Sequence, residues 1–316
     1  MTQTSIYLPF AERKPDSQYH DLLQKIMSTG RLVDPFWNKS QKAVARMICG
    51  HEMRFRIGNG FPAITERDMS GKYFLGASGE HLAFVNGVHT HEELVKWGCP
   101  YWKKWVTKEK CAMFGLPAGD LGPGSYGPGW TRVPTPDGRF FNQIECLMET
   151  IEAAKTEGVS PRTLEMNPWI PFYALGKKRQ VVVAPCHGWI HVHFFPNEKE
   201  IVIEHRQRSA DAPVGLAFNM IQYAIFGLML QHLTGYKFTE LVYWITDAHI
   251  YENWVEDGKE KSQLKHVAEL LTREPRVLPR VWIEAPEVKR IFDFRPEHFK
   301  MDEYNPHPEM FIPTPI

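Results

Sequence analysis

Cys186 is the side chain in this sequence best suited to act as a nucleophile. It follows a proline and the apolar run 179–184, which predicts a strand. A strand end holds a thiol rigidly while leaving it open to a cleft, and a nearby cation would lower its pKa. His187 is next in the chain, but neighbours on an extended chain point to opposite faces, so it is not automatically the base. Taken alone, Cys186 is better interpreted as a buried structural cysteine.

A basic segment at 205–219, HRQRSADAPVGLAFN, gives this cysteine a chemical context. Arg206, Arg208 and Ser209 follow a predicted strand. Arginine and serine are good phosphate ligands, because a guanidinium matches two phosphate oxygens at once. One of these arginines could also hold the thiolate of Cys186. Each residue alone is equally explained by an exposed basic turn before a helix.

Asp211 and Asn219 offer groups that recognise a heterocycle. The carboxylate of Asp211 accepts hydrogen bonds from an amino-substituted ring, and the amide of Asn219 has enough donors and acceptors to read a pyrimidine edge. The segment 247–254, DAHIYENW, adds His249 and Tyr251, which could bind sugar hydroxyls. The alternative for that segment is the start of an amphipathic helix capped by its aspartate.

The composition favours an ordinary globular protein. The chain has 316 residues, with 37 Lys+Arg and 37 Asp+Glu, so zero net charge gives no general argument for nucleic acid or membrane as partner. The five cysteines are widely spaced and lack a CxxC, which fits a reducing compartment. The N-terminus lacks the apolar core of a signal peptide, and polar residues within the apolar stretch 214–233 favour a buried helix. We therefore expect a cytoplasmic protein.

His191 and His193 form a pattern that invites a metal ion. Two ligands on one strand are weak evidence, because closed metal sites usually need four, and neither CxxC nor HExxH accompanies them. The sequence also contains no P-loop and no GxGxxG. We predict no metal site.

The elements that must position these side chains mix helices and strands. Expected helices cover 18–29, 79–96, 141–157, 214–233 and 248–254. Expected strands cover 179–184, 188–195, 200–206, 239–245, 280–284 and 290–293, with a hairpin at 50–67 and a Gly/Pro-rich loop at 118–139. Without strict βαβ alternation, this order predicts an α+β fold, a single domain built on one large mixed β-sheet flanked by helices. Residues 1–16 are expected to form an N-terminal arm and residues 17–316 the catalytic domain.

Several motifs, in one order along nearly the whole chain, resemble those of the thymidylate synthase family. The strongest are APCH at 184–187, QRSAD at 207–211, GLAFN at 215–219 and DAHIYEN at 247–253. GHEMRF at 50–55, GFPAIT at 60–65 and a tail containing REPRVLP, IFDF and YNPHP add to them. One such motif can arise by chance, whereas this many in the family's order is highly specific. The resemblance implies a thymidylate synthase-like fold.

The resemblance implies a covalent mechanism in which Cys186 attacks C6 of a pyrimidine nucleoside monophosphate. C5 would then accept a one-carbon unit from 5,10-methylenetetrahydrofolate. The implied catalytic residues are Cys186, Glu80 as proton relay, Tyr126 near C5 proton removal, Asn219 at the base edge and Asp211 at the pterin. The implied substrate ligands are Arg208, Ser209, Gln207, Lys42, His249, Tyr251 and, from the second subunit of a homodimer, Arg162. The implied folate contacts are Trp102, Asp211, Gly215 and Ile316 in a closing tail.

The chain departs from the family pattern around the phosphate and the cofactor side. Ser40 stands at a phosphate arginine, with Lys39 or Lys42 as the nearest substitute, and Pro161 replaces one of two paired arginines. Ile245 and Thr246 replace a double glycine, and Trp254 replaces a histidine. Methyl transfer to dUMP is the default prediction. The departures keep open a hydroxymethylase acting on (d)CMP or (d)UMP and, in another class, a nucleotide-binding protein that has lost catalysis.

Overall fold

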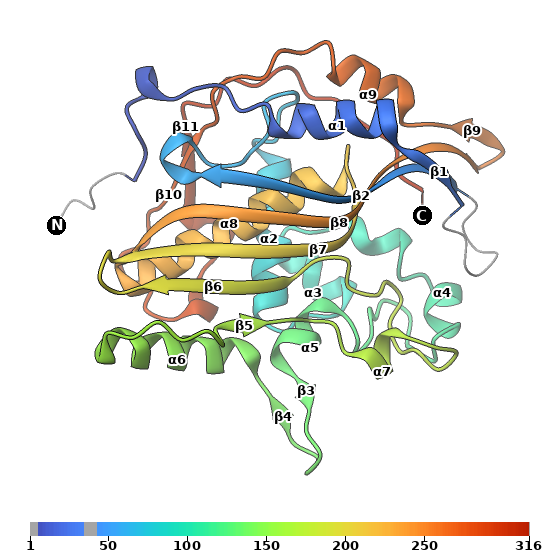
Figure 1. The fold of residues 1–316 in the computed structure, drawn as a ribbon. Coiled ribbons are helices and arrows are strands. Elements are labelled where there is room, and N and C mark those ends of the chain that lie inside the picture. Colours follow the sequence, from blue (N-terminus) through green and yellow to red (C-terminus); the bar gives the residue numbers. More distant parts are fainter. Residues whose placement is uncertain (1–5, 35–42, 316) are drawn as a thin grey trace.

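A large mixed β-sheet organises the computed structural model, which describes residues 6–34 and 43–315 (Figure 1). Within these residues the sheet has seven strands: six in the order β1-β2-β8-β7-β6-β5, with β9 added to β8. β7 and β8 run parallel, and the other neighbours are antiparallel. Helices α2 and α8 lie together behind the sheet in this view. The predicted α+β fold with one large sheet flanked by helices is confirmed.

The bounds of the elements are as follows. The strands are β1 (Arg31–Val33), β2 (Ala43–Arg56), β3 (Val133–Pro134), β4 (Phe140–Phe141), β5 (Glu165–Met166), β6 (Trp189–Phe195), β7 (Glu200–Asp211), β8 (Lys237–Glu256), β9 (Lys259–Lys261), β10 (Arg280–Ile283) and β11 (Phe299–Asp302). The helices are α1 (Gln18–Thr29), α2 (Lys72–Val85), α3 (His91–Lys96), α4 (Lys108–Ala112), α5 (Tyr126–Thr131), α6 (Gln143–Glu157), α7 (Pro171–Ala174), α8 (Gly215–Thr234) and α9 (Leu264–Leu270).

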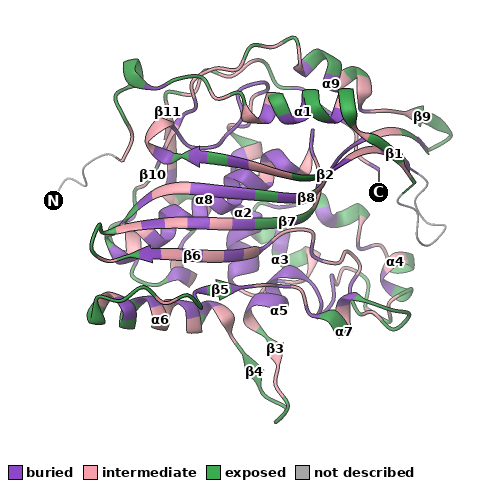
Figure 2. Ribbon diagram, viewed as in Figure 1, coloured by how far each residue is buried: buried purple, intermediate pink, exposed green. Residues whose placement is uncertain are grey.

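Helix α8 is the centre of the core. It is mostly apolar around its whole circumference, as a helix enclosed by other elements should be, and it is drawn mostly as buried in Figure 2. Its length and composition would also suit a membrane span, but 78% of its most apolar stretch is buried inside the protein. The expectation of a buried helix at 214–233 is therefore confirmed, as are the helices expected at 18–29 and 141–157.

The helix expected at 248–254 was wrong. These residues continue β8, which is one strand of 20 residues. β8 pairs along most of its length with β2 on one side and with β7 on the other, and this pairing overrides the local polar pattern. The expected strand at 179–184 was also wrong, because that segment is irregular and is followed by β6 from Trp189. Cys186 therefore lies in a loop before a strand.

Four further expectations needed correction. The segment 50–67 is not a hairpin: β2 runs on to Arg56, and an irregular buried segment follows a short 3-10 turn at Ile57–Asn59. The helix expected at 79–96 is two helices, because Gly87, with φ of +75°, ends the first and Thr90 caps the second. The strand expected at 290–293 is a 3-10 turn. Within the Gly/Pro-rich loop at 118–139, residues Tyr126–Thr131 form α5.

Candidate active site

The parallel pairing of β7 with β8 brings two distant motifs together. Ser209 lies opposite Asp247, and Asp211 lies opposite His249. The Ser209 hydroxyl donates to Asp247 Oδ2 at 3.1 Å, and His249 Nδ1 lies 2.9 Å from the other Asp247 oxygen. Tyr251, two residues beyond His249, holds its ring 4.9 Å from the imidazole. The sheet thus presents a hydroxyl, an imidazole and a phenol along one end of two strands.

The thiol of Cys186 faces the guanidinium of Arg208. Arg208 Nη2 lies 3.3 Å from Cys186 Sγ, and the Arg208 backbone N–H donates to the Cys186 carbonyl at 2.7 Å. Arg208 Nε also donates to the Pro185 carbonyl at 3.2 Å. On the other side, the Cys186 N–H donates to the Tyr126 hydroxyl at 2.9 Å. The loop that carries the thiol is therefore held by β7 and α5 together.

The charge on Arg208 favours the thiolate of Cys186. Burial raises the pKa of the Cys186 thiol above its ordinary value, and Arg208 and the Tyr126 hydroxyl oppose this shift. The cation therefore stands where a thiolate would need it, while the half-buried thiol remains protonated at neutral pH.

His187 is not placed as the base for this thiol. Its Nδ1 is hydrogen-bonded to the Tyr223 hydroxyl, and its ring stacks on Tyr126 with centroids 4.3 Å apart. Burial, followed by the charges of His81 and Arg208, lowers the pKa of His187 to about 3. The imidazole is therefore neutral at physiological pH and serves as a packing and hydrogen-bonding group.

Glu80 is a buried carboxylate that accepts hydrogen bonds at both of its oxygens. Trp102 Nε1 donates to one oxygen at 2.5 Å, Gln222 Nε2 donates to the other at 2.5 Å, and the Cys99 thiol lies 3.8 Å away. Burial raises the pKa of Glu80, and the bonds from Trp102 and Gln222 lower it. A carboxyl group poised between these effects is suited to proton transfer. Gln222 was missed from the sequence, although its spacing of three residues from Asn219 on α8 was available as a signal.

Asn219 continues the same buried network on the other side of Gln222. Its Nδ2 donates to Gln222 Oε1 at 3.0 Å, and its Oδ1 accepts from Gln207 Nε2 at 3.0 Å. Gln207 Oε1 in turn accepts from the Tyr243 hydroxyl. Gln207 is only 2% exposed, so its side chain supports Asn219 from beneath rather than lining an open surface.

Asp211 holds the C-terminal tail. Thr314 Oγ1 donates to Asp211 Oδ2 at 2.7 Å, and Gln263 Nε2 bridges Asp211 and the Pro313 carbonyl at 3.2 and 2.9 Å. Burial raises the pKa of Asp211, and the charge of His249 opposes the shift. The tail is thus docked beside the strand that carries Arg208.

Of the other predicted residues, Gly215 lies beside the cluster, Arg162 lies on an exposed turn, and the rest lie outside the described residues. Arg162 is exposed on the turn between α6 and β5. Gly215 is the first residue of α8 and lies beside Asp211 and Asn219. Lys42 and Ile316, together with Ser40, lie outside the described residues.

The comparison with known families identifies the class of the protein. The thymidylate synthase family model matches residues 17–315, nearly the whole chain. The chain therefore belongs to the thymidylate synthase family. Membership makes it a thymidylate synthase-like one-carbon transferase for pyrimidine nucleotides, in a family that uses methylenetetrahydrofolate.

Proposed function

We propose that this protein transfers a one-carbon unit to C5 of a pyrimidine nucleoside monophosphate, converting dUMP to dTMP by default. The observation that carries the proposal is the 3.3 Å separation of Arg208 Nη2 from Cys186 Sγ. A thiol held beside a guanidinium becomes a nucleophile when substrate binding completes the site. Family membership supplies the class of substrate.

In the proposed reaction Cys186 Sγ forms a bond to C6, and the electrons of the C5–C6 double bond shift toward O4. C5 then forms a bond to the one-carbon unit, which is what methylenetetrahydrofolate supplies when bound. The proton on C5 leaves toward the Tyr126 region, and Glu80 relays protons through water. As this proton leaves, the carbon–nitrogen bond between the one-carbon unit and folate would break. The methylene group on C5 would then take a hydride from tetrahydrofolate, giving a methyl group and dihydrofolate, or hydroxide from water, giving a hydroxymethyl group and tetrahydrofolate. The Cys186–C6 bond would break as the ring double bond returns, which regenerates the enzyme. Asn219 would hold the base edge throughout.

The phosphate and the sugar would bind at the ends of β7 and β8. Arg208 and Ser209 would contact the phosphate, and His249 with Tyr251 would contact sugar hydroxyls. The 2.9 Å hydrogen bond in which Asp247 Oδ1 accepts from His249 Nδ1 orients the His249 ring and leaves its Nε2 for the ligand. Lys42, which lies outside the described residues, remains our proposal for a further phosphate cation.

The residues proposed for folate offer polar and aromatic groups that fit a pterin ring. Asp211 offers a half-buried carboxylate, which accepts from the adjacent N–H groups of such a ring, and Trp102 offers an indole edge that is 9% exposed. A Cβ atom at Gly215 would lie 3.9 Å from Asn219 Oδ1 and 4.0 Å from Asp211 Cβ, which is ordinary van der Waals contact, so Gly215 lies between these two side chains. We propose that these residues hold the folate and that the tail, including Ile316, excludes water above it.

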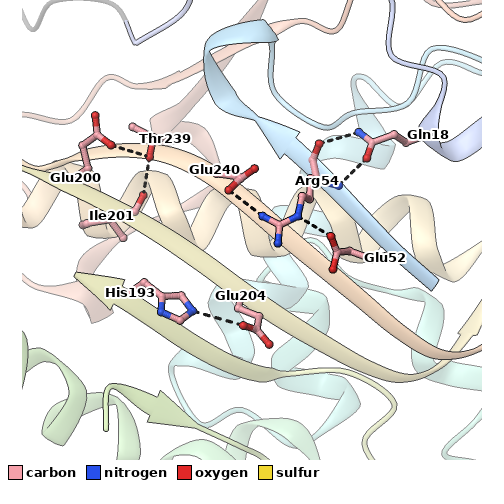
Figure 3. A network of polar contacts seen from close by, with 9 residues as sticks. All are labelled: Gln18, Glu52, Arg54, His193, Glu200, Ile201, Glu204, Thr239 and Glu240. Atoms are coloured by element: carbon pink, nitrogen blue, oxygen red, sulfur yellow. Dashed lines mark hydrogen bonds and ion pairs between the residues drawn. The ribbon is translucent and has the colours of Figure 1, made fainter. Parts of the chain in front are cut away.

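A homodimer is the assembly that we propose, in the cytoplasm. Among the described residues, no helix covers the face of β6, β7 and β8 that looks toward the viewer in Figure 1. The side chains there include ion pairs such as Arg54–Glu240 and His193–Glu204, drawn in Figure 3, and Trp244, which is 41% exposed. A second copy packed on this face would cover Trp244 and could bring Arg162 to the phosphate of its partner.

Exchange of C5 hydrogen tests the proposal directly. Wild-type protein and Cys186→Ala are incubated with C5-tritiated UMP, dUMP, CMP and dCMP, and Cys146→Ala is the matched control. We expect tritium release with at least one nucleotide, lost in Cys186→Ala and kept in Cys146→Ala. Addition of methylenetetrahydrofolate then separates products by mass: a methylated base with dihydrofolate supports the default, and a hydroxymethylated base with tetrahydrofolate supports the hydroxymethylase. No tritium release from any nucleotide, either without or with methylenetetrahydrofolate, would leave only a binding protein.

A further inference from the structure

Gln222 joins the buried carboxylate of Glu80 to the amide of Asn219. It lies three residues after Asn219 on α8, so the two side chains are neighbours on the helix surface. Its Nε2 donates to Glu80 Oε2 at 2.5 Å, and its Oε1 accepts from Asn219 Nδ2 at 3.0 Å. Gln222 is 1% exposed, Glu80 5% and Asn219 6%, so water does not compete for these bonds.

The direction of each amide in this network is set by groups that only accept hydrogen bonds. An ionised Glu80 requires Gln222 to present Nε2, which leaves Gln222 Oε1 for Asn219 Nδ2. At the other end, Gln207 Nε2 donates to the Ser209 carbonyl at 3.0 Å as well as to Asn219 Oδ1 at 3.0 Å. The Glu80 carboxylate and the Ser209 carbonyl therefore favour the same direction for the Asn219 amide, with Nδ2 toward Gln222 and Oδ1 toward Gln207.

An Asn219 amide that is held in one direction can form matching hydrogen bonds with only one of the two bases, uracil or cytosine. After these bonds, Asn219 retains one N–H and one lone pair of Oδ1 for a ligand. Uracil presents a carbonyl at C4 beside an N3–H, whereas cytosine presents an amino group beside a bare N3, so the two bases need opposite amide directions. Rotation of Asn219 would set donor against donor at Gln207 and acceptor against acceptor at Gln222, which leaves buried polar groups unpaired.

We propose that Gln222 is a positioning residue for base discrimination, which with Gln207 locks the Asn219 amide so that the site accepts one of uracil and cytosine and rejects the other. This inference rests on the proposed function. Gln222 contacts no reacting atom in this scheme and acts through Asn219 and Glu80. The base accepted in the default reaction is uracil.

The test compares base discrimination in three variants by C5 hydrogen exchange on uracil and cytosine nucleotides. Gln222→Leu removes both bonds, and we expect the ratio of kcat/KM between the preferred and the rejected base to fall about tenfold. Gln222→Glu keeps an acceptor for Asn219 but sets a second carboxyl beside Glu80. It should hold the base ratio within about twofold while moving the acidic limb of the exchange profile to higher pH. Gln231→Leu on the same helix is the matched control, because Gln231 accepts from the Phe238 N–H away from this network.

A folded Gln222→Leu protein with an unchanged base ratio would overturn the inference. If Gln222→Leu does not fold, Gln222→Met keeps the length of the side chain and is judged by the same criterion. Failure of the proposed function is distinguishable, because wild-type protein would then exchange no nucleotide at all. Wild-type exchange with an unmoved ratio in the variant refutes only the role of Gln222.

Discussion

The Thr314 hydroxyl donates a 2.7 Å hydrogen bond to the Asp211 carboxylate, which ties the C-terminal tail to the end of β7. The tail is anchored further back as well. Arg273 Nη1 donates to the Pro308 carbonyl at 2.8 Å, and the His307 N–H donates to the Thr65 carbonyl at 2.8 Å. The contact at Thr314 is therefore the last of several that hold the tail over the candidate site.

Loss of the Thr314 hydroxyl should loosen this closed tail. Thr314→Val keeps the shape of the side chain and removes the bond, which contributes about 1 kcal/mol. We expect KM for methylenetetrahydrofolate to rise about fivefold and the tail to be cleaved faster by a carboxypeptidase. Thr156→Val, which removes an exposed hydroxyl of α6, is the control. Unchanged KM and cleavage in Thr314→Val would show that the bond does not hold the tail.

Arg208 should control the reactivity of Cys186. In Arg208→Gln the cation is lost, so the pKa of the Cys186 thiol rises further and less thiolate is present at any given pH. The rate of alkylation by iodoacetamide at pH 8 should fall by about tenfold. Arg206→Gln is the matched control, because Arg206 is two residues away on β7 and stacks over Trp189 instead. Equal alkylation rates in Arg208→Gln and Arg206→Gln would show that Arg208 does not control the reactivity of the Cys186 thiol.

Trp102 should set the pH range of Glu80. Trp102→Phe keeps an aromatic ring but removes the N–H that stabilises the carboxylate, so the pKa of Glu80 rises. A general base acts only when it is ionised, so a higher pKa of Glu80 makes activity fall off at a higher pH on acidification. The acidic limb of the C5 exchange profile should therefore move to higher pH by about one unit. Trp105→Phe, three residues away, should leave the limb in place. An unshifted acidic limb in Trp102→Phe would show that Glu80 is not the group whose titration sets this limb.

Glu66 should make stability depend on pH. It is 2% exposed, and burial raises its pKa from 4.5 to about 7. The folded protein then holds the Glu66 proton more tightly than the unfolded chain, so the free energy of unfolding falls as pH rises from about 4.5 to 7. The loss is on the order of 3 kcal/mol. Urea unfolding of Glu66→Gln at pH 5 and pH 8 should show a smaller difference than wild type, with exposed Glu198→Gln as control; equal differences would refute the assignment.

The cluster around Cys186 could be predicted from the sequence motifs, because the residues that surround this thiol lie in short polar segments near the ends of strands. Arg208 beside the thiol and His249 near Asp211 follow from such runs once β7 and β8 pair. Gln222 was not foreseen, since a glutamine in a helix is usually a surface residue and its burial is set by α2 packing against α8.

The errors in the fold arose where tertiary pairing outweighed local pattern. Residues 248–254 contain polar side chains at spacings that suit a helix, but pairing with β2 and β7 holds them as a strand. The segment 179–184 is apolar enough for a strand, yet in the described structure it forms no ladder. The long helix and the overall class were predictable because their apolar patterns extend over many residues.

The parallel pairing of β7 with β8 also has a consequence for how the enzyme becomes active. The two strands are separated in the chain by the whole of α8, so their ladder is a non-local contact that closes late and slowly during folding. A slip of one residue would turn Asp211 and His249 to opposite sides of the sheet. Activity should therefore return in refolding experiments only after helical structure has largely recovered, and nascent chains that lack β8 cannot carry out the reaction.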